Sequence, residues 1–212
     1  KHRICEWNSF DKDLLDLENL ILNEKKKINP FLTLSFYESP QLPKTSAEIF
    51  FTTEYNVQNN QNYKFHNQTK KKIRIAYYSA DFRNHPMSYL LANLYELHDK
   101  NKFEIIGISF GPDKDDEMRK RVSSAFDEFY DVRLKTEDEI VQFSRKLKID
   151  IAIDLMCFTK HHKFGIFVKR CAPIQVNYLG YPGTSGTNYL DYIIADKILI
   201  PKESQKYYSE KI

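Results

Sequence analysis

The sequence predicts an α/β fold with a doubly wound parallel sheet, because apolar strand-like runs and helical stretches alternate from Ile73 onwards. Short apolar runs typical of buried strands recur at residues 73–78, 103–109, 149–155, 174–178 and 192–194. Helical stretches lie between them, at residues 87–98, about 115–125 and 136–147. Strands that alternate with helices of about 10 to 15 residues form parallel βαβ units. In such sheets, ligands bind at the carboxyl ends of the strands.

Two of these helices carry clear start patterns. Pro86 stands where the helix of residues 87–98 begins, and proline suits a first helical position because its missing N–H is not needed there. Thr136 and Glu139 form the capping-box pattern at the start of the helix of residues 136–147.

The N-terminal residues predict a helix ahead of the sheet. Leu14, Leu17 and Ile21 recur at helical spacing, and Asn8 or Ser9 is placed to cap that helix.

A second helix and a connector follow. Asn29-Pro30 is expected to end the element before it, and a helix is expected around residues 47–51. Residues 53–70 are rich in Asn and Gln and predict a connecting loop. The predicted organisation is therefore a helical segment with a connector over residues 1–70, followed by an α/β lobe over residues 71–212.

Composition and charge argue against several classes of protein. Hydrophobic residues make up 42% of the 212 residues, which is enough for a packed core. Charged residues make up 29%, but the formal net charge is +3 and the lysines are dispersed, so we expect no nucleic-acid partner. No apolar run reaches about 18 residues, so we expect no membrane span. The basic start lacks the apolar core of a signal peptide.

The three cysteines, Cys5, Cys157 and Cys171, form no CxxC pair. Their odd number and wide spacing predict reduced thiols of a cytoplasmic protein and no metal site. The chain begins with Lys and ends without a recognisable tail, which is expected of a piece of a longer protein.

The first candidate site follows the strand of residues 73–78. Asp81, Asn84 and His85 lie in the turn to the next helix, whose N-terminus attracts anions and whose free N–H groups are expected to point at the same place. His85 could donate to a phosphate or sugar oxygen, and Asp81 could accept from a hydroxyl. The alternative is a simple capping turn, with Asp81 or Asn84 as the cap and no role for His85.

The second candidate stretch ends the strand of residues 149–155. Thr159 offers a hydroxyl, and Lys160 and Lys163 offer positive charge. The adjacent His161 and His162 are expected to lie in a solvated loop rather than to share a metal ion.

The third candidate stretch is YLGYPGTSG, residues 178–186, which holds three of the six glycines in the chain. Glycine lets a ligand approach the backbone closely, so a ligand loop is favoured over a plain surface turn. The dinucleotide, Walker A and GxSxG motifs are all absent. Cys157 with His161 as nucleophile and base is disfavoured, because a buried Cys usually acts as a small hydrophobe.

Taken together, these stretches closely resemble one family. RIAYYSADFRNHP, DLMCFTK, APIQVNYLGYPGTSG and DYIIAD follow one another in the order and spacing of the O-GlcNAc transferase and SPINDLY family, glycosyltransferase family 41. The resemblance is strongest over residues 72–212 and extends more weakly to residues 5–8. DFxNHP and LGYPGTSG are its most specific parts.

The resemblance implies a catalytic region of the GT-B type, with two Rossmann-like lobes behind tetratricopeptide repeats. This chain resembles the first lobe and the segment before it, so the chain alone is expected to be inactive. Family members transfer a sugar, with inversion and without a metal, from a nucleotide donor to Ser or Thr of an acceptor protein. UDP-GlcNAc is the expected donor. GDP-fucose, used by the plant SPINDLY branch, is the alternative.

The resemblance also implies roles for eight residues. By motif position, Asp81, Asn84 and His85 line the sugar and acceptor side of the cleft, and Asp81 is one candidate for the catalytic base. Binding of the donor is assigned to Thr159, Lys163, Leu179, Gly180 and Pro182.

The chain departs from the family pattern at several positions. Cys157 and Phe158 stand where Gly-Tyr is common, and Met87 stands where animal enzymes have Thr. The changes at Cys157 and Phe158 motivate a second hypothesis, a non-catalytic binding or scaffold module that keeps the fold.

Overall fold

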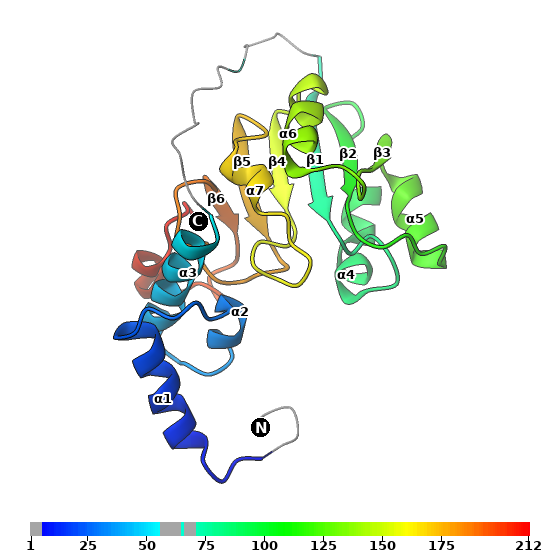
Figure 1. Ribbon diagram of the computed structural model, residues 1–212. Coiled ribbons are helices and arrows are strands. Elements are labelled where there is room, and N and C mark those ends of the chain that lie inside the picture. The colour runs from blue at the N-terminus through cyan, green and yellow to red at the C-terminus, as the bar shows by residue number, and fades with distance from the viewer. Residues whose placement is uncertain (1–5, 56–64, 66–70) are drawn as a thin grey trace.

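A computed structural model describes residues 6–55, 65 and 71–212. Its centre is a six-stranded, wholly parallel sheet with strand order β3-β2-β1-β4-β5-β6 (Figure 1). The strands are β1 (Ile73–Ser79), β2 (Phe103–Ser109), β3 (Glu128–Asp131), β4 (Ile151–Asp154), β5 (Ile174–Tyr178) and β6 (Tyr192–Ile194). This order is that of a doubly wound Rossmann-like sheet, and it confirms the predicted fold class. The order reverses between β1 and β4, which places the switch point there.

Helices cover both faces of the sheet because alternate residues of each strand point to opposite sides. Ile75 and Tyr77 of β1 pack with buried side chains of α4 (Pro86–Glu96) and α5 (Glu117–Ala125). Their neighbour Tyr78 packs on the opposite face, with side chains of α6 (Glu137–Lys146) and α7 (Gly165–Val168). The core is therefore two apolar layers with the sheet between them.

The predicted capping box is confirmed. Thr136 is the N-cap of α6, its hydroxyl accepts from the Glu139 N–H, and the Glu139 carboxylate accepts from the Thr136 N–H. The short elements β3 and α7 were not predicted. β3 is a half-buried edge strand of four residues with a carboxylate at each end, so it lacks the apolar run that identifies a buried strand.

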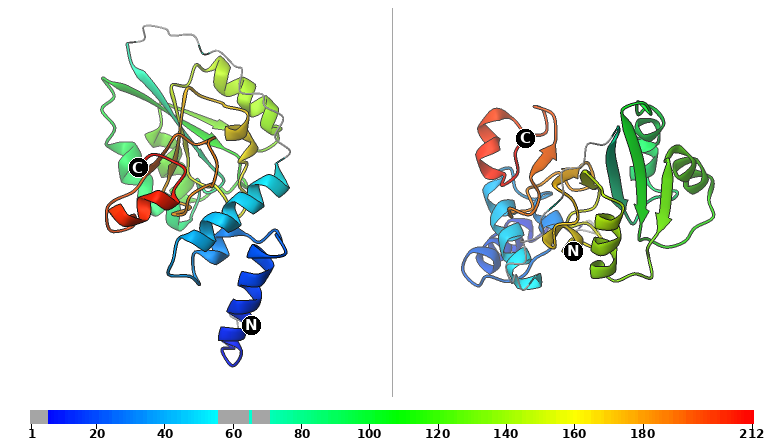
Figure 2. Two further views of the ribbon diagram at one scale, coloured as in Figure 1. Left: turned by 90° about the vertical axis from the view of Figure 1, so that its left-hand side faces the viewer. Right: turned by 90° about the horizontal axis from the view of Figure 1, so that it is seen from above.

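The N-terminal segment forms α1 (Phe10–Leu22), α2 (Pro30–Thr33) and α3 (Gln41–Glu54). Helix α1 extends away from the sheet in Figure 1 and in the left-hand view of Figure 2. Ser9 holds its N-cap position, although the Ser9 hydroxyl donates to Asp13 instead of accepting from a backbone N–H.

The expectation that Asn29-Pro30 ends an element is wrong. Asn29 is the N-cap of α2, its side chain accepts from the Phe31 N–H, and Pro30 is the first helical residue. The pattern is a helix start because proline's fixed φ suits that position.

The predicted helix around residues 47–51 is confirmed as part of α3, whose Phe50 and Phe51 are buried in the same apolar layer as Tyr78. Most of the predicted connector, residues 56–64 and 66–70, lies outside the described residues. The boundary at residue 70 stays a prediction. α3 nevertheless shares a hydrophobic core with the lobe.

After β6 the chain forms a 3-10 turn, η2 (Lys202–Tyr207), and returns to pair Lys211 with Tyr192. Among the described residues, no helix has both the length and the apolar character that a membrane crossing requires.

Candidate active site

A pocket of about 640 Å³ lies at the switch point of the sheet. It is formed by the loops that follow β1, β4 and β5, together with α2. The lining residues are Asn29, Phe31, Leu32, Asp81, Arg83, His85, Pro86, Met87, Leu155, Thr159, Lys160, His161 and Gly180. The structure thus brings together residues from all three candidate stretches, at the edge where doubly wound sheets bind ligands.

The loop after β1 holds a buried carboxylate beside an arginine. Asp81 is 8% exposed, and its Oδ1 accepts a hydrogen bond from Arg83 Nη2 at 2.9 Å. The loop backbone is held by two serines: Ser79 Oγ accepts from the Asp81 N–H, and Ser88 Oγ donates to the Asp81 carbonyl. The carboxylate therefore has a fixed position with a cation on one side. Sequence reasoning gave no role to Arg83.

His85 is the N-cap of α4. Its Nδ1 accepts the Met87 N–H at 3.3 Å and lies 3.8 Å from Asp81 Oδ2. Because Nδ1 acts as the acceptor, the neutral imidazole carries its proton on Nε2, which makes Nε2 a hydrogen-bond donor. The capping role expected for Asp81 or Asn84 therefore belongs to His85.

The expectation that α4 presents free N–H groups is also wrong. The Met87 N–H is bonded to the His85 ring, and the N–H groups of Ser88 and Tyr89 are bonded to the His85 carbonyl. The helix start thus contributes its positive dipole to the pocket, and the direct donor there is the imidazole.

Asn84 does not line the pocket. Its side-chain oxygen accepts from the Tyr89 hydroxyl at 2.7 Å, and its N–H donates to Asp116 at 2.9 Å. These bonds join the β1 loop to α4 through Tyr89 and to the start of α5 through Asp116, so Asn84 supports the loop from the outside.

Some polar residues of the loop after β4 line the pocket, and others make contacts elsewhere. Thr159, Lys160 and His161 line the pocket. Lys163 does not, and its Nζ donates to the Lys135 carbonyl at 2.8 Å.

The expectation of a solvated His161-His162 pair holds for His161 only. His162 packs against Phe50 and Phe158, and burial lowers the pKa of its imidazole. Among the described residues, no group of three or more His, Cys, Asp and Glu side chains is arranged to hold a metal ion.

The two departures beside Thr159 lie beneath the pocket and not on its wall. Cys157 and Phe158 are completely buried, and Phe158 packs against Phe50, Phe164 and Tyr181. Cys157 has φ +44°, a left-handed conformation that favours glycine. Burial raises the pKa of the Cys157 thiol, so this free thiol is not a ready nucleophile.

The glycine-rich loop (residues 179–186) approaches the pocket through Gly180. A Cβ on Gly180 would lie 1.9 Å from the Leu155 carbonyl oxygen, so a side chain is excluded there. Leu179 and Pro182 line a neighbouring, mostly apolar pocket of about 370 Å³ at the ends of β5 and β6. The loop therefore separates two pockets, and its three sequence-predicted residues divide between them, with Gly180 in one and Leu179 and Pro182 in the other.

Helix α2 provides a wall of the pocket that sequence reasoning missed. Asn29, Phe31 and Leu32 line it, and the Phe31 ring lies 6.2 Å from that of Tyr181. The helix start at Asn29-Pro30 was the available pattern, but the sequence does not show where so short a helix packs.

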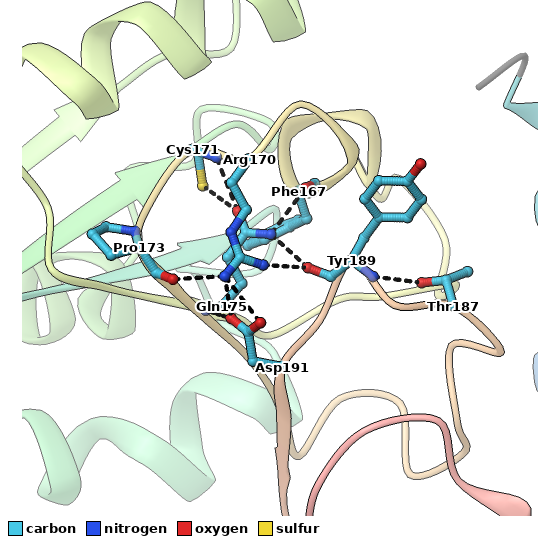
Figure 3. A network of polar contacts seen from close by, with 8 residues as sticks. All are labelled: Phe167, Arg170, Cys171, Pro173, Gln175, Thr187, Tyr189 and Asp191. Atoms are coloured by element: carbon cyan, nitrogen blue, oxygen red, sulfur yellow. Dashed lines mark hydrogen bonds and ion pairs between the residues drawn. The ribbon is translucent and has the colours of Figure 1, made fainter. Parts of the chain in front are cut away.

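A polar network holds the passage from β5 to β6 (Figure 3). Arg170 forms a two-pronged ion pair with Asp191 at 2.7 and 2.9 Å. Gln175, completely buried in β5, donates to the carbonyls of Phe167 and Tyr189. These contacts fix the chain downstream of the glycine-rich loop without touching the pocket.

Comparisons with known proteins agree with this geometry. The sequence profile of glycosyl transferase family 41 matches residues 4–212. The probable UDP-N-acetylglucosamine–peptide N-acetylglucosaminyltransferase SEC of Arabidopsis thaliana is 37% identical over 67% of this chain and 14% of its own length. The UDP-N-acetylglucosamine–peptide N-acetylglucosaminyltransferase of Caenorhabditis elegans is 28% identical over 99% of this chain and 20% of its own length.

A mutant O-GlcNAc transferase of Thermobaculum terrenum has a similar solved structure, with a TM-score of 0.73 and 26% identity. The match covers 85% of this chain and 35% of that one. The chain thus spans a minor part of the relatives that it matches. With the parallel sheet and the pocket at its switch point, the profile match over residues 4–212 shows that this chain belongs to glycosyltransferase family 41.

Proposed function

We propose that this chain is the first catalytic lobe of a protein O-linked glycosyltransferase, which transfers GlcNAc with inversion from UDP-GlcNAc to Ser or Thr of an acceptor protein. The observation that carries the proposal is that Asp81, His85, Thr159 and Gly180 line one pocket at the switch point. We place the second lobe and the tetratricopeptide repeats elsewhere in a longer polypeptide. Alone, the chain is inactive because it supplies one side of the donor site. The free, buried thiols of Cys157 and Cys171 fit the cytoplasmic location that we also propose.

The chemistry requires the acceptor hydroxyl to attack in line with the leaving nucleotide. In the proposed arrangement, the Asp81 carboxylate accepts the hydroxyl proton while Arg83 holds it in place. His85 donates from Nε2 to an oxygen of the sugar or the acceptor. The dipole of α4 and the pocket-lining Lys160 favour negative charge that develops on the leaving side.

Three further residues complete the proposed donor side. Thr159 offers its hydroxyl to the sugar or its phosphates, and Gly180 offers a bare backbone surface against which the sugar packs. Leu179 and Pro182 support this surface from the neighbouring pocket. Contacts of Asn84 and Lys163 with the donor would require both side chains to leave their present partners, so we assign them supporting roles in the loops.

The scaffold alternative rests on Cys157 and Phe158, and the structure gives it little support, because both side chains are buried below the pocket wall. GDP-fucose stays the alternative donor. In our proposal this pocket contacts the sugar and not the nucleotide base, so its residues do not select between uridine and guanosine.

The test is a transfer assay with the longest natural polypeptide that contains this chain. It is incubated with a Ser/Thr-rich acceptor peptide and either UDP-GlcNAc or GDP-fucose, and the peptide is analysed by mass spectrometry. We expect one N-acetylhexosamine on a hydroxyl residue with UDP-GlcNAc, and none with the Asp81→Asn variant. A deoxyhexose from GDP-fucose would change the donor but keep the family chemistry. No transfer from either donor, to any of a panel of peptides, would contradict the proposal.

A further inference from the structure

We propose that Glu210 is a positioning residue for the donor site, which acts by fixing the glycine-rich loop. This inference rests on the proposed function. It concerns the segment of residues 208–210, here called the latch, which follows η2 and forms hydrogen bonds with the loop.

Glu210 is a buried carboxylate whose partners all belong to the loop. It is 5% exposed. Its Oε2 accepts from the Thr184 hydroxyl at 2.7 Å, and its Oε1 accepts from the Ser185 N–H at 2.7 Å and from the Ser185 hydroxyl. No cation forms an ion pair with Glu210 in the described part of the chain. Burying a carboxylate is costly unless hydrogen bonds replace its water, so these bonds tie Glu210 and the loop together.

Two further contacts extend the latch along the loop. The Tyr208 hydroxyl donates to the Pro182 carbonyl at 3.0 Å, and the Ser209 N–H donates to Thr184 Oγ1 at 3.1 Å. In addition, Asn177 of β5 donates to the carbonyls of Tyr181 and Gly183 at 3.0 and 3.4 Å. Each of the three successive carbonyls of residues 181–183 therefore accepts a hydrogen bond from a side chain, so the backbone acceptors at the centre of the loop are all satisfied.

The loop needs this support because its backbone is unusual. Leu179 has φ +68° and Gly186 has φ +66°, and Gly180 is pressed against the Leu155 carbonyl. Such conformations are energetically unfavourable, and they are kept only where several surrounding contacts hold the backbone in place. The network of Figure 3 fixes the chain after Thr187, and Asn177 holds the loop centre. Glu210 makes three of the hydrogen bonds that hold Thr184 and Ser185, beside the bond from the Ser209 N–H to Thr184 and the contact between the Ser185 and Thr187 hydroxyls.

The consequence for the pocket follows from chain distance. Gly180 lines the pocket and is separated from Thr184 by three residues, all of them held by the latch or by Asn177. If Glu210 is removed, residues 184 and 185 lose three hydrogen bonds, and the surface at Gly180 loses part of the support that fixes its position. Because displacements of about 1 Å in a binding site can cost about a hundredfold, the effect is expected on donor binding and not on stability alone.

The experiment compares Glu210→Ala with Asp191→Asn in the longest natural polypeptide that contains this chain. Asp191 is a matched control: its carboxylate also holds the passage from β5 to β6, through Arg170 and the Gln175 N–H, but it touches neither the loop nor the pocket. Three quantities are measured: the Kd for UDP-GlcNAc by calorimetry, the hydrogen exchange of peptides that cover residues 179–186, and Tm.

We expect Glu210→Ala to raise the Kd about tenfold or more and to speed exchange in the loop. Asp191→Asn is expected to lower Tm while its Kd stays within about twofold of wild type. Glu210→Gln keeps one acceptor oxygen and is expected to be intermediate, which provides a folded variant if the alanine protein is insoluble.

A Glu210→Ala or Glu210→Gln protein that loosens the loop but binds UDP-GlcNAc as wild type does would overturn the positioning role alone. Equal losses of affinity in the Glu210 and Asp191 variants would overturn it too, because they would report general destabilisation. A wild-type protein that binds no nucleotide sugar would instead overturn the proposed function, and this inference with it.

Discussion

Asp81 and Arg83, two residues apart in the loop after β1, form an ion pair of 2.9 Å whose two side chains both line the pocket. The arginine fixes the carboxylate without covering it, since Asp81 Oδ2 is left facing His85 at 3.8 Å. An ion pair in this place makes Asp81 the best-oriented acidic group of the site.

Replacing Asp81 by Asn removes the negative charge and keeps the shape. If Asp81 accepts the acceptor proton, kcat for transfer falls about 100-fold or more, while the Kd for the donor changes far less. Asp115→Asn, an exposed carboxylate beside Lys120, is the control and is expected to leave kcat unchanged. Steady-state kinetics of the longer polypeptide decide the matter. A wild-type kcat in Asp81→Asn would remove Asp81 from the proton transfer.

His85 combines two roles that substitutions can separate. His85→Ala removes the cap of α4 and is expected to lower the free energy of unfolding by about 1 kcal/mol. His85→Asn restores a side-chain acceptor for the Met87 N–H, so its stability is expected to lie near wild type.

Both His85 substitutions lose the Nε2 donor, so both are expected to weaken binding of UDP-GlcNAc more than binding of UDP. Urea unfolding and calorimetry measure the two effects. If His85→Asn binds UDP-GlcNAc as tightly as wild type does, His85 is a cap and nothing more.

Gly180 and Gly183 offer a matched pair in one loop. Gly180→Ala forces a Cβ against the rigid Leu155 carbonyl and is expected to cost about 1 to 3 kcal/mol of stability, with loss of donor binding. A Cβ on Gly183 would meet the side-chain ends of Tyr181 and Leu34 at 2.9 to 3.0 Å, and Leu34 can turn away. Gly183→Ala is therefore expected to be the milder change. The reverse order of Tm and of donor Kd would show that the loop conformation is wrong.

Cys157 occupies a left-handed backbone position that the family pattern gives to glycine. Cys157→Gly and Cys157→Ala both remove the buried sulfur, but only glycine relieves the backbone. We expect Cys157→Gly to be about 0.5 to 1 kcal/mol more stable than Cys157→Ala, although glycine is normally the less stable of the two in regular structure. Urea unfolding of both variants tests this order. An advantage for alanine would mean that the backbone at residue 157 bears no strain.

Asp154, at the end of β4, is 1% exposed, and burial raises its pKa to about 7. The folded protein therefore holds this proton more tightly than the unfolded chain does, in which the pKa is near 3.8. The contribution of Asp154 to stability is thus full below about pH 4, falls as the pH rises towards 7, and is flat above it.

Asp154→Asn keeps an acceptor for the Met156 N–H and removes the titration. Relative to wild type, the variant should gain about 2 to 4 kcal/mol of unfolding free energy between pH 4.5 and pH 8. Urea unfolding of both proteins across this range provides the comparison. Parallel pH profiles would show that Asp154 is ionised in the folded protein throughout.

The sequence predicted the sheet because parallel strands buried on both faces appear as apolar runs, and the helices between them have distinct starts at Pro86 and Thr136. It also placed Asp81, His85, Thr159 and Gly180 at one edge, because the carboxyl ends of parallel strands share an edge. Strand β3 was not predicted, because a half-buried strand at the edge of the sheet has no continuous apolar run in its sequence.

The rest of the site depends on side-chain direction and on long-range packing, which spacing does not reveal. Lys163 points to the Lys135 carbonyl instead of the pocket, and Asn84 turns to Tyr89. The wall from Phe31 and the latch from Glu210 come from segments at least 25 residues away from the loop residues that they contact. Histidine is not among the preferred N-caps, so the capping role of His85 was assigned to its neighbours.

The first measurement is a calorimetric titration of the longest natural polypeptide with UDP, UDP-GlcNAc and GDP-fucose, beside its His85→Ala variant. We expect micromolar binding of UDP and UDP-GlcNAc by the wild type. The variant is expected to lose affinity for UDP-GlcNAc and to keep its affinity for UDP, because His85 faces the sugar in the proposed arrangement. Absence of heat with all three ligands, from a protein shown to be folded, would contradict the assignment of this pocket to a nucleotide-sugar transferase.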